Sequence, residues 1–152
     1  MAWTIRDARV GDLDALNHVY RRAALSNPGD RAILLARPEA LEVTAASLTI
    51  GRTRVAAIGG RVVGYVTSSL HGDRLELDAL FVDPDHRRRG IAHDLVMDAV
   101  AFAQAGEVDQ IEVTANPDAV AFYDQMGFME IGVVDTPLGV PATRLRRPVS
   151  GG

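Results

Sequence analysis

The segment from Leu75 to Ala103 constrains the fold of this chain more than any other part of the sequence. From Leu77 to Val82, alternate residues can share a face, which is the period of a β-strand. Pro84 cannot extend a β-ladder, so the strand should end near Val82. Beyond Gly90, apolar residues recur at helical spacing, at Ile91, Leu95, Val96, Ala99 and Phe102 or Ala103. The segment therefore predicts a strand, a turn and a helix.

The turn of this segment is cationic, because Arg87, Arg88 and Arg89 precede Gly90. The first turn of a helix presents backbone N–H groups without helical partners and the positive end of the helix dipole. Glycine lets the backbone approach a ligand closely. Together these features predict an anion site suited to a phosphate or pyrophosphate. The alternative is a basic turn that is simply solvated.

The whole chain sets limits on the class of protein. Its 152 residues predict a single domain at positions 1–149, followed by a frayed tail at 150–152. No cysteine is present, which excludes disulfides, thiolate metal sites and a cysteine nucleophile, and no histidine cluster suggests a metal. No apolar run approaches a membrane span, and the first residues lack the apolar core of a secretory signal. The net charge of −4 argues against a nucleic-acid partner, and a cytoplasmic location is expected.

Periodicity and turn signals give the remaining elements. Helices are expected after Asp12, which is a plausible cap, from about Pro38 to about Ser47, and after Asn116 as far as Gly127. A turn is expected at 71–73. The predicted strands are 3–6, 53–58, 62–70, 75–82, 110–114, 128–134 and 141–146. This order predicts an α+β (mixed α/β) fold with a central, mostly antiparallel sheet of six or seven strands and about four helices.

Two motifs carry a resemblance to a known family. Val82-Asp83-Pro84 is followed by Arg87-x-x-Gly90-x-Ala92, and Asn116-Pro117-x-Ala119-x-x-Phe122-Tyr123-x-x-x-Gly127-Phe128 follows one helix and one strand later. In this order and spacing the motifs resemble those of the GNAT superfamily of acyl-CoA-dependent N-acyltransferases. The resemblance implies the GNAT fold, acetyl-CoA as co-substrate and no metal. The family often has glycine at the positions of Arg88 and Ala92.

The resemblance also implies the residues that hold the donor. The backbone N–H groups of Arg88, Arg89, Gly90, Ile91 and Ala92 would hold the CoA pyrophosphate, with the side chains of Arg87 and Arg89 as the favoured contributors. The backbone of Leu80, Phe81 and Val82 would pair with the pantetheine arm, which requires the sheet to splay, and a β-bulge is expected near Ala79 to Phe81. Asn116 would cap its helix, bind the pantetheine arm, or do both.

Acyl transfer from a thioester to an amine requires a proton to be given to the CoA sulfur and a proton to be taken from the amine. Tyr123 stands at the family's position for a general acid at the CoA sulfur, and the alternative for it is a core aromatic. Glu112 and Asp78 are candidates for the base that takes a proton from the amine, and the alternative for each is a solvent-facing strand carboxylate. His71 is expected at the surface. An ordered water chain in place of a side-chain base also stays open.

The resulting functional expectation is an N-acetyltransferase that moves an acetyl group from acetyl-CoA directly to a primary amine on a small molecule or a peptide. The alternative is a non-catalytic acyl-CoA-binding or regulatory domain of the same fold. Neither nucleic acid nor membrane is expected as a partner, and the resemblance allows a homodimer. No motif identifies the acceptor.

Overall fold

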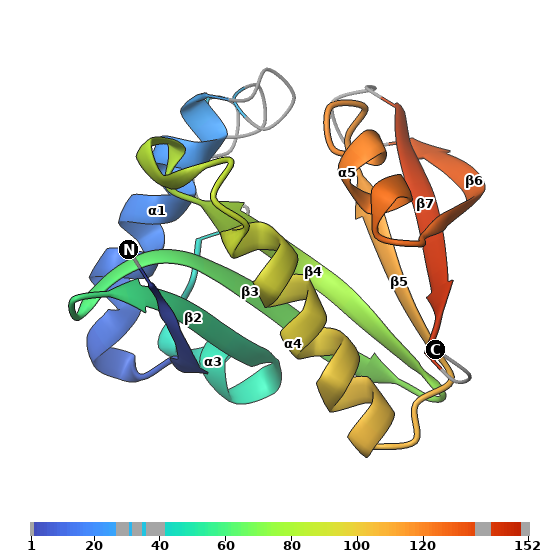
Figure 1. Cartoon of the computed structure of the whole chain (residues 1–152), viewed down its shortest axis with the longest axis horizontal. Coiled ribbons are helices and arrows are strands. Elements are labelled where there is room, and N and C mark those ends of the chain that lie inside the picture. Colours follow the sequence, from blue (N-terminus) through green and yellow to red (C-terminus); the bar gives the residue numbers. More distant parts are fainter. Residues whose placement is uncertain (1, 27–30, 32–34, 36–41, 136–140, 150–152) are drawn as a thin grey trace.

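The computed structural model describes residues 2–26, 31, 35, 42–135 and 141–149. They form a seven-stranded sheet in the order β1-β2-β3-β4-β5-β7-β6 (Figure 1). The strands are β1 Thr4–Asp7, β2 Arg52–Ile58, β3 Arg61–His71, β4 Arg74–Val82, β5 Gln110–Ala115, β6 Met129–Asp135 and β7 Pro141–Pro148. The α-helices described are α1 Leu13–Leu25, α3 Ala45–Ile50, α4 Ile91–Ala105 and α5 Val120–Gln125, with single 3-10 turns η1 Val10–Asp12 and η2 Pro84–His86.

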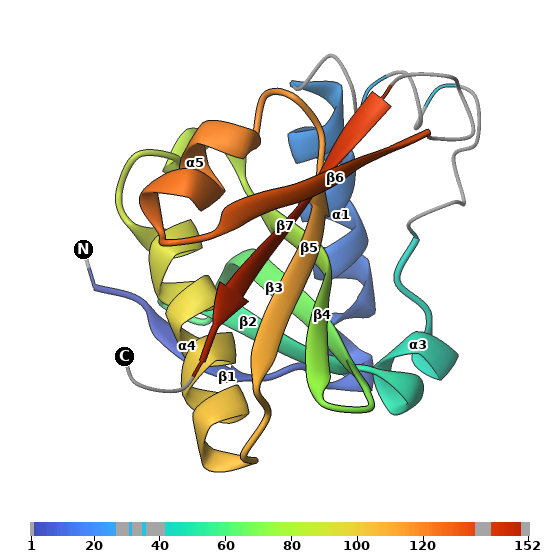
Figure 2. The same ribbon diagram turned by 90° about the vertical axis from the view of Figure 1, so that its right-hand side faces the viewer.

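The pairing directions confirm the predicted mixed sheet. The pairs β1/β2, β2/β3 and β3/β4 are antiparallel, the pair β4/β5 is parallel, and β7 is antiparallel to both β5 and β6. A parallel pair needs a crossover, and α4 supplies it between β4 and β5. Helices α4 and α5 cover one face of the sheet, while α1 and α3 lie on the other (Figure 2).

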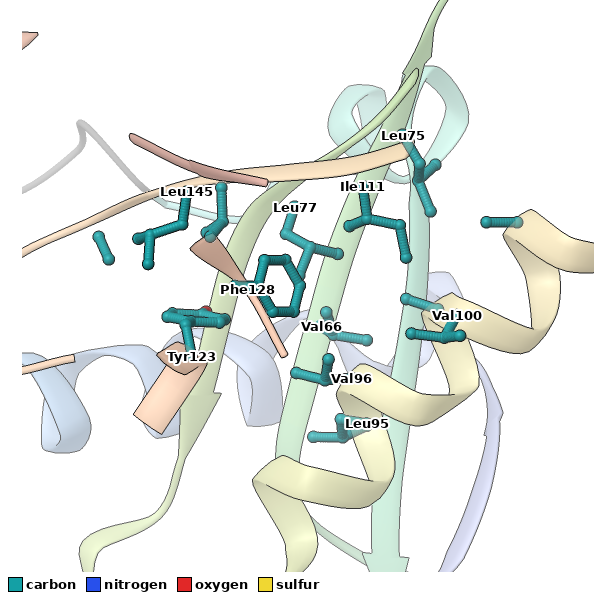
Figure 3. Packing of buried hydrophobic residues seen from close by; sticks show 14 of the residues in the cluster. Val66, Leu75, Leu77, Leu95, Val96, Val100, Ile111, Tyr123, Phe128 and Leu145 are labelled. Atoms are coloured by element: carbon teal, nitrogen blue, oxygen red, sulfur yellow. The ribbon is translucent and has the colours of Figure 1, made fainter. Parts of the chain in front are cut away.

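Each face of the sheet has its own apolar core. On the α4 face, Leu95 and Val96 of the helix pack with strand residues such as Val66 and Leu77, and Figure 3 shows this cluster continuing to α5. On the α1 face, Leu16 and Tyr20 pack with residues including Tyr65 and Phe81. The Tyr20 and Phe81 rings meet edge to face, with centroids 5.3 Å apart. The sheet is therefore held from both sides.

Strands β4 and β5 pair only over a short stretch, from Arg74–Gln110 to Leu77–Val113, and then separate. The separation coincides with a bulge in β4. Opposite β3, Thr67 pairs with Ala79 and Ser68 with Leu77, so Asp78 is the extra residue. The bulge expected near Ala79 to Phe81 thus lies one residue earlier. A bulge bends its strand and increases the local twist, which fits the divergence of β4 from β5.

Three local predictions need correction. The side chain of Asp12 makes no bond with α1, because it accepts a bond from the Arg9 backbone N–H (2.8 Å) and pairs with Arg6. His71 ends β3 and pairs with Arg74 in the ladder, and does not lie in the turn.

The helix expected from about Pro38 to about Ser47 begins only at Ala45, and its first positions lie outside the described residues. Residues 42–44 are not helical. Thr44 caps α3 by accepting a bond from the Ser47 N–H, and the Asn17 side chain bonds both the N–H and the C=O of Val43. These bonds hold the chain extended just before the helix.

Gly64 of β3 lies where the start of α4 meets the sheet. A Cβ atom built there would be 3.2 Å from the Phe81 carbonyl oxygen and 3.3 Å from methyl carbons of Val82 and Ile91. Such contacts are tighter than ordinary van der Waals contact, and one partner is backbone. Glycine therefore allows the first turn of α4 to sit against the end of β4.

Gly64→Ala should lower the free energy of unfolding by about 1–3 kcal/mol, the usual cost of overpacking a filled core. Urea denaturation followed by circular dichroism measures the change. Gly11→Ala is the matched control, because a Cβ atom there meets nothing within 4 Å and the change should stay within about 0.5 kcal/mol. Equal effects of the two variants would show that close packing at Gly64 is unimportant.

Candidate active site

A cleft of about 700 Å³ opens where β4 and β5 part. Figure 1 shows the two strands close at one end and apart at the other, with α5 beyond β5. The cleft is lined on one side by β4, the turn after it and the start of α4, and on the other side by β5 and the segment through α5. One residue each from α1 and β7 completes the lining. The lining residues are Ala23, Leu77, Asp78, Ala79, Leu80, Phe81, Val82, Arg87, Arg88, Ala92, Val113, Thr114, Ala115, Asn116, Asp118, Ala119, Phe122, Tyr123 and Ala142.

The turn that enters α4 has the backbone shape expected of an anion site. Gly90 adopts φ 91°, in the left-handed region, and the helix starts directly after it. The first helical N–H groups, from Ile91 onwards, have no partners within the helix. Arg88 also has a positive φ, of 62°, which is unusual for a residue with a side chain. Two left-handed residues in three thus turn the chain sharply before the helix.

Ion pairs hold this turn against the end of α1. Arg22 donates to Asp83 at 3.1 Å and to Asp85 at 2.9 Å. Asp83 is buried and also accepts a bond from the Asp85 backbone N–H. Burial alone would raise the pKa of Asp83, but that N–H and the Arg22 guanidinium hold its pKa below the usual range.

The three arginines of the turn occupy different places. Arg87 lines the cleft, but its guanidinium bonds the Ser26 hydroxyl at 2.6 Å and the Ala23 carbonyl at 3.4 Å, so it also caps the end of α1. Arg88 lines the cleft and is exposed. Arg89 is exposed but is not among the lining residues. Of the two arginines favoured by the sequence analysis, Arg87 lines the cleft and Arg89 does not, and Arg88 lines it as well.

The edge of β4 that carries Leu80, Phe81 and Val82 borders the cleft. In the described sheet this edge has no strand partner beyond Leu77, because the ladder with β5 ends there. Backbone N–H and C=O groups on such an edge can pair with an extended ligand as a strand would. The side chains of Phe81 and Val82 are buried in the two cores and fix the edge in place.

The far wall of the cleft carries two aromatic residues of α5. Tyr123 is buried, with 5% of its surface exposed, and still lines the cleft. Its ring contacts Phe122 and Phe128 edge to face, with centroids 5.1 and 5.3 Å away, and Figure 3 shows it beside Phe128. Phe122 packs against the core and lines the cleft as well. Tyr123 is thus both a core aromatic and a cleft residue.

Asn116 precedes α5 and also lines the cleft. Its side-chain oxygen accepts a bond from the Ala119 backbone N–H at 3.1 Å, so the predicted capping role is present. The capping bond and the place at the cleft are compatible, because an amide side chain offers several donors and acceptors.

Glu112 is tied into a network of ion pairs on the α1-side face of the sheet. It accepts from Arg144 at 2.6 Å and from Arg146 at 3.2 Å, and Arg144 also pairs with Glu76. Burial would raise the pKa of Glu112, but the two arginines hold it below its ordinary value. Glu112 is not among the cleft-lining residues. A carboxylate with a lowered pKa and two cationic partners is a poor proton acceptor.

The surroundings of Asp78 differ from those of Glu112 in both position and hydrogen-bond partner. It is the bulged residue of β4, lines the cleft, and accepts a 2.7 Å bond from the Ser69 hydroxyl. Partial burial raises the pKa of Asp78, and the nearby charge of Glu76 adds to the rise, although Ser69 and His71 oppose it. A raised pKa makes a carboxylate a better proton acceptor.

Several cleft residues were missed by sequence reasoning. Ala23 comes from the end of α1 and Ala142 from β7, and neither has a chemical group that draws attention in a sequence. Thr114 and Asp118 flank Asn116, so only their neighbourhood could have indicated them. No group of three or more His, Cys, Asp and Glu residues that could hold a metal occurs in the described part of the chain. Among the described helices, none is long and apolar enough to cross a membrane.

Comparison with known families gives a clear result for this arrangement. The model of the acetyltransferase (GNAT) domain matches residues 39–147. The chain belongs to the GNAT family of acetyltransferases. The resemblance of its two motifs is thereby confirmed, and so is the α+β fold with its seven-stranded mixed sheet.

Individual relatives agree with this assignment. Human N-acetyltransferase 8 is 37% identical over 81 residues, which cover 47% of this chain and 36% of the relative. The N-alpha-acetyltransferase RimI of Mycobacterium tuberculosis is 34% identical over 79 residues, covering 49% of this chain and 50% of the relative. The matches thus span half or less of these relatives' own length.

Among solved structures, the PaiA N-acetyltransferase of Thermoplasma acidophilum in complex with coenzyme A is similar in fold. Its TM-score is 0.79 at 15% identity, covering 97% of this chain and 99% of that one. At this identity the likeness shows the shared fold alone.

Arg88→Gly should raise the free energy of unfolding by about 1 kcal/mol, because a side chain in the left-handed region is strained and glycine is not. Urea denaturation at fixed salt measures the gain. Arg89→Gly removes the same charge one position away, where φ is not positive, and should be neutral or slightly destabilising. A gain of the same size in both variants would point to charge, and not to backbone strain at Arg88.

Proposed function

We propose that this protein transfers an acetyl group from acetyl-CoA directly to a primary amine on a small molecule or a peptide. One observation carries the proposal: a single cleft combines the glycine turn at a helix start, an unpaired β4 edge and a buried tyrosine. Family membership and the N-acetyltransferase names of the relatives support it.

Acetyl-CoA, the acetyl donor, would lie along the side of the cleft that β4 forms. The backbone N–H groups from Arg88 to Ala92 would bind its pyrophosphate, with the Arg88 side chain adding positive charge. The pantetheine arm would pair with the open edge from Leu80 to Val82. Since α5 forms the opposite wall, the pantetheine would run between the β4 edge and Asn116, with the thioester towards Tyr123. One N–H of the β4 edge would stabilise the developing oxyanion.

The transfer forms a C–N bond and breaks the C–S bond of the thioester. An alkylammonium acceptor, with a pKa of about 10, must first lose one proton to become a nucleophile. After attack, the nitrogen loses a second proton, and the thiolate leaving group gains one. Tyr123, which lines the cleft, would donate a proton to the sulfur and regain one from the nitrogen. The sum is one acetamide, one CoA thiol and one released proton.

Asp78 is our choice for the group that takes the first proton. It lines the same cleft as Tyr123 and its pKa is raised, whereas Glu112 lies outside the lining with a lowered pKa. The two carboxylates therefore differ in both position and basicity. We assign proton transfer to Asp78 and an ion-pairing role to Glu112.

The activity test is release of CoA thiol from acetyl-CoA in the presence of peptide N-termini and alkylamines. We expect turnover with at least one class, and Tyr123→Phe should reduce kcat about 100-fold or more by removing the acid. Tyr65→Phe is the control, because the Tyr65 hydroxyl is buried in the α1-side core and has no hydrogen-bond partner among the described residues. Binding of CoA without thiol release for any amine would instead favour a non-catalytic acyl-CoA-binding domain.

The base assignment predicts a pH profile. A base works only when unprotonated, so kcat/KM should fall as pH drops through the pKa of Asp78, which lies above that of an ordinary aspartate. Asp78→Asn should remove this acidic limb and lower kcat/KM about 100-fold. Glu112→Gln should lower the melting temperature, because Arg144 and Arg146 lose a partner, without moving the limb. The assignment fails if Glu112→Gln alone moves it.

A further inference from the structure

Trp3, the residue before β1, lies against the start of α4. Its indole Nε1 donates to Asp94 Oδ2 at 3.0 Å, although the two residues are 91 positions apart in the sequence. Two carbons of the same ring are 3.8 and 3.9 Å from the place that a Cβ atom on Gly90 would take. The side chain is partly buried and packs against the core on the α4 face. One indole thus spans the glycine of the turn and the first turn of the helix.

The turn before α4 is held at both of its ends. Arg22 fixes its beginning through Asp83 and Asp85. At its end, the Trp3 ring supplies the only described atoms outside the adjoining chain within 4 Å of the Cβ position at Gly90. Support for this end of the turn therefore comes from a residue at the other edge of the sheet.

We propose that Trp3 is a positioning residue for the donor: it holds Gly90 and the first turn of α4 in the shape that binds the CoA pyrophosphate. The proposal rests on the donor site proposed above. Neither Trp3 nor Asp94 is among the described residues that line the cleft, so Trp3 acts through the turn without touching the donor.

The flexibility of glycine is the first reason to expect this role. Gly90 has φ 91°, and a glycine can leave this region for many other conformations. Shapes that turn the N–H groups of Ile91 and Ala92 away from the cleft have to be given up when the pyrophosphate binds. Ordering a segment on binding costs affinity, and order that exists beforehand removes this cost. The affinity for CoA should therefore depend on the indole.

The charge of Asp94 is the second reason. Its carboxylate lies in the first turn of α4, where the helix dipole favours a negative charge. The same charge repels a pyrophosphate bound at the helix start. The Trp3 N–H holds one carboxylate oxygen, and His93 Nδ1 lies 3.4 Å from the other. The bond from Trp3 thus keeps Asp94 turned towards β1 and out of the cleft lining.

The closing experiment measures the Kd of CoA by titration calorimetry for the unaltered protein, Trp3→Phe and Trp3→Ala. Trp3→Phe keeps an aromatic ring and loses the N–H, so Kd should rise about 3-fold, and Trp3→Ala should raise it about 10-fold. In thiol release, KM for acetyl-CoA should rise by the same factors with kcat unchanged. Ile5→Ala is the matched control, because Ile5 packs on the same core from the same strand and lies farther than 4 Å from the Cβ position at Gly90. It should lower the melting temperature and leave Kd unchanged.

Two further comparisons locate the effect. In an Asp94→Ala background the N–H has lost its acceptor, so Trp3→Phe should change Kd by less than it does in the unaltered protein. An equal factor in both backgrounds contradicts the role of this bond. The second comparison uses S-acetylpantetheine, a donor without the pyrophosphate and the nucleotide. Its kcat/KM should be the same for Trp3→Phe and the unaltered protein, and a loss as large as that for acetyl-CoA contradicts an effect at the turn.

The outcomes separate this proposal from the proposed function. If both Trp3 variants bind CoA as the unaltered protein does, or Ile5→Ala weakens binding as much as they do, the role of Trp3 is overturned alone. If CoA binds and no amine gives thiol release, the acetyl transfer fails, while the calorimetric comparison still decides the role of Trp3. An unaltered protein that binds no CoA overturns both.

Discussion

Strands β4 and β5 keep their ladder from Arg74–Gln110 to Leu77–Val113, and the next residue of β4 is the bulged Asp78. This interruption determines most of what the molecule can do. It ends the parallel pairing, so the two arms diverge and a cleft opens between them. It leaves the β4 edge beyond Leu77 without a strand partner in the described sheet. It also brings the Asp78 carboxylate to that cleft.

Where β4 and β5 separate, the backbone ladder no longer joins the two halves of the sheet, so other contacts must keep each half in place. Each face supplies a core: α4 and α5 pack on one side, and α1 on the other. The end of α1 is further tied to the turn after β4 by Arg22 with Asp83 and by Arg87 with Ser26. The turn that starts α4 is therefore fixed before any ligand arrives, which is the condition for binding an anion through backbone groups at low entropic cost.

Sequence reasoning reached the order of strands and helices because periodicity and turn residues are local signals. The glycine turn at Gly90 and the place of Tyr123 at the cleft followed from motif and spacing. The position of the bulge depends on how β4 pairs with β3, so no pattern within 75–82 could locate it. The side chain of Asp12 bonds outside α1 because Arg6 lies in a neighbouring strand.

The carboxylates show most clearly what only the fold decides. Glu76, Asp78 and Glu112 are alike in sequence as charged residues on strands, and alternation puts the first two on one face. Arg144, far along the chain on β7, reaches both glutamates and leaves Asp78 to Ser69. Burial raises the pKa of both groups, but the arginine partners of Glu112 bring its pKa below the ordinary value, whereas the bond from Ser69 only partly opposes the rise for Asp78. Because their environments push the pKa values of similar groups apart, one sheet face can hold structural ion pairs beside a carboxylate that accepts protons more readily.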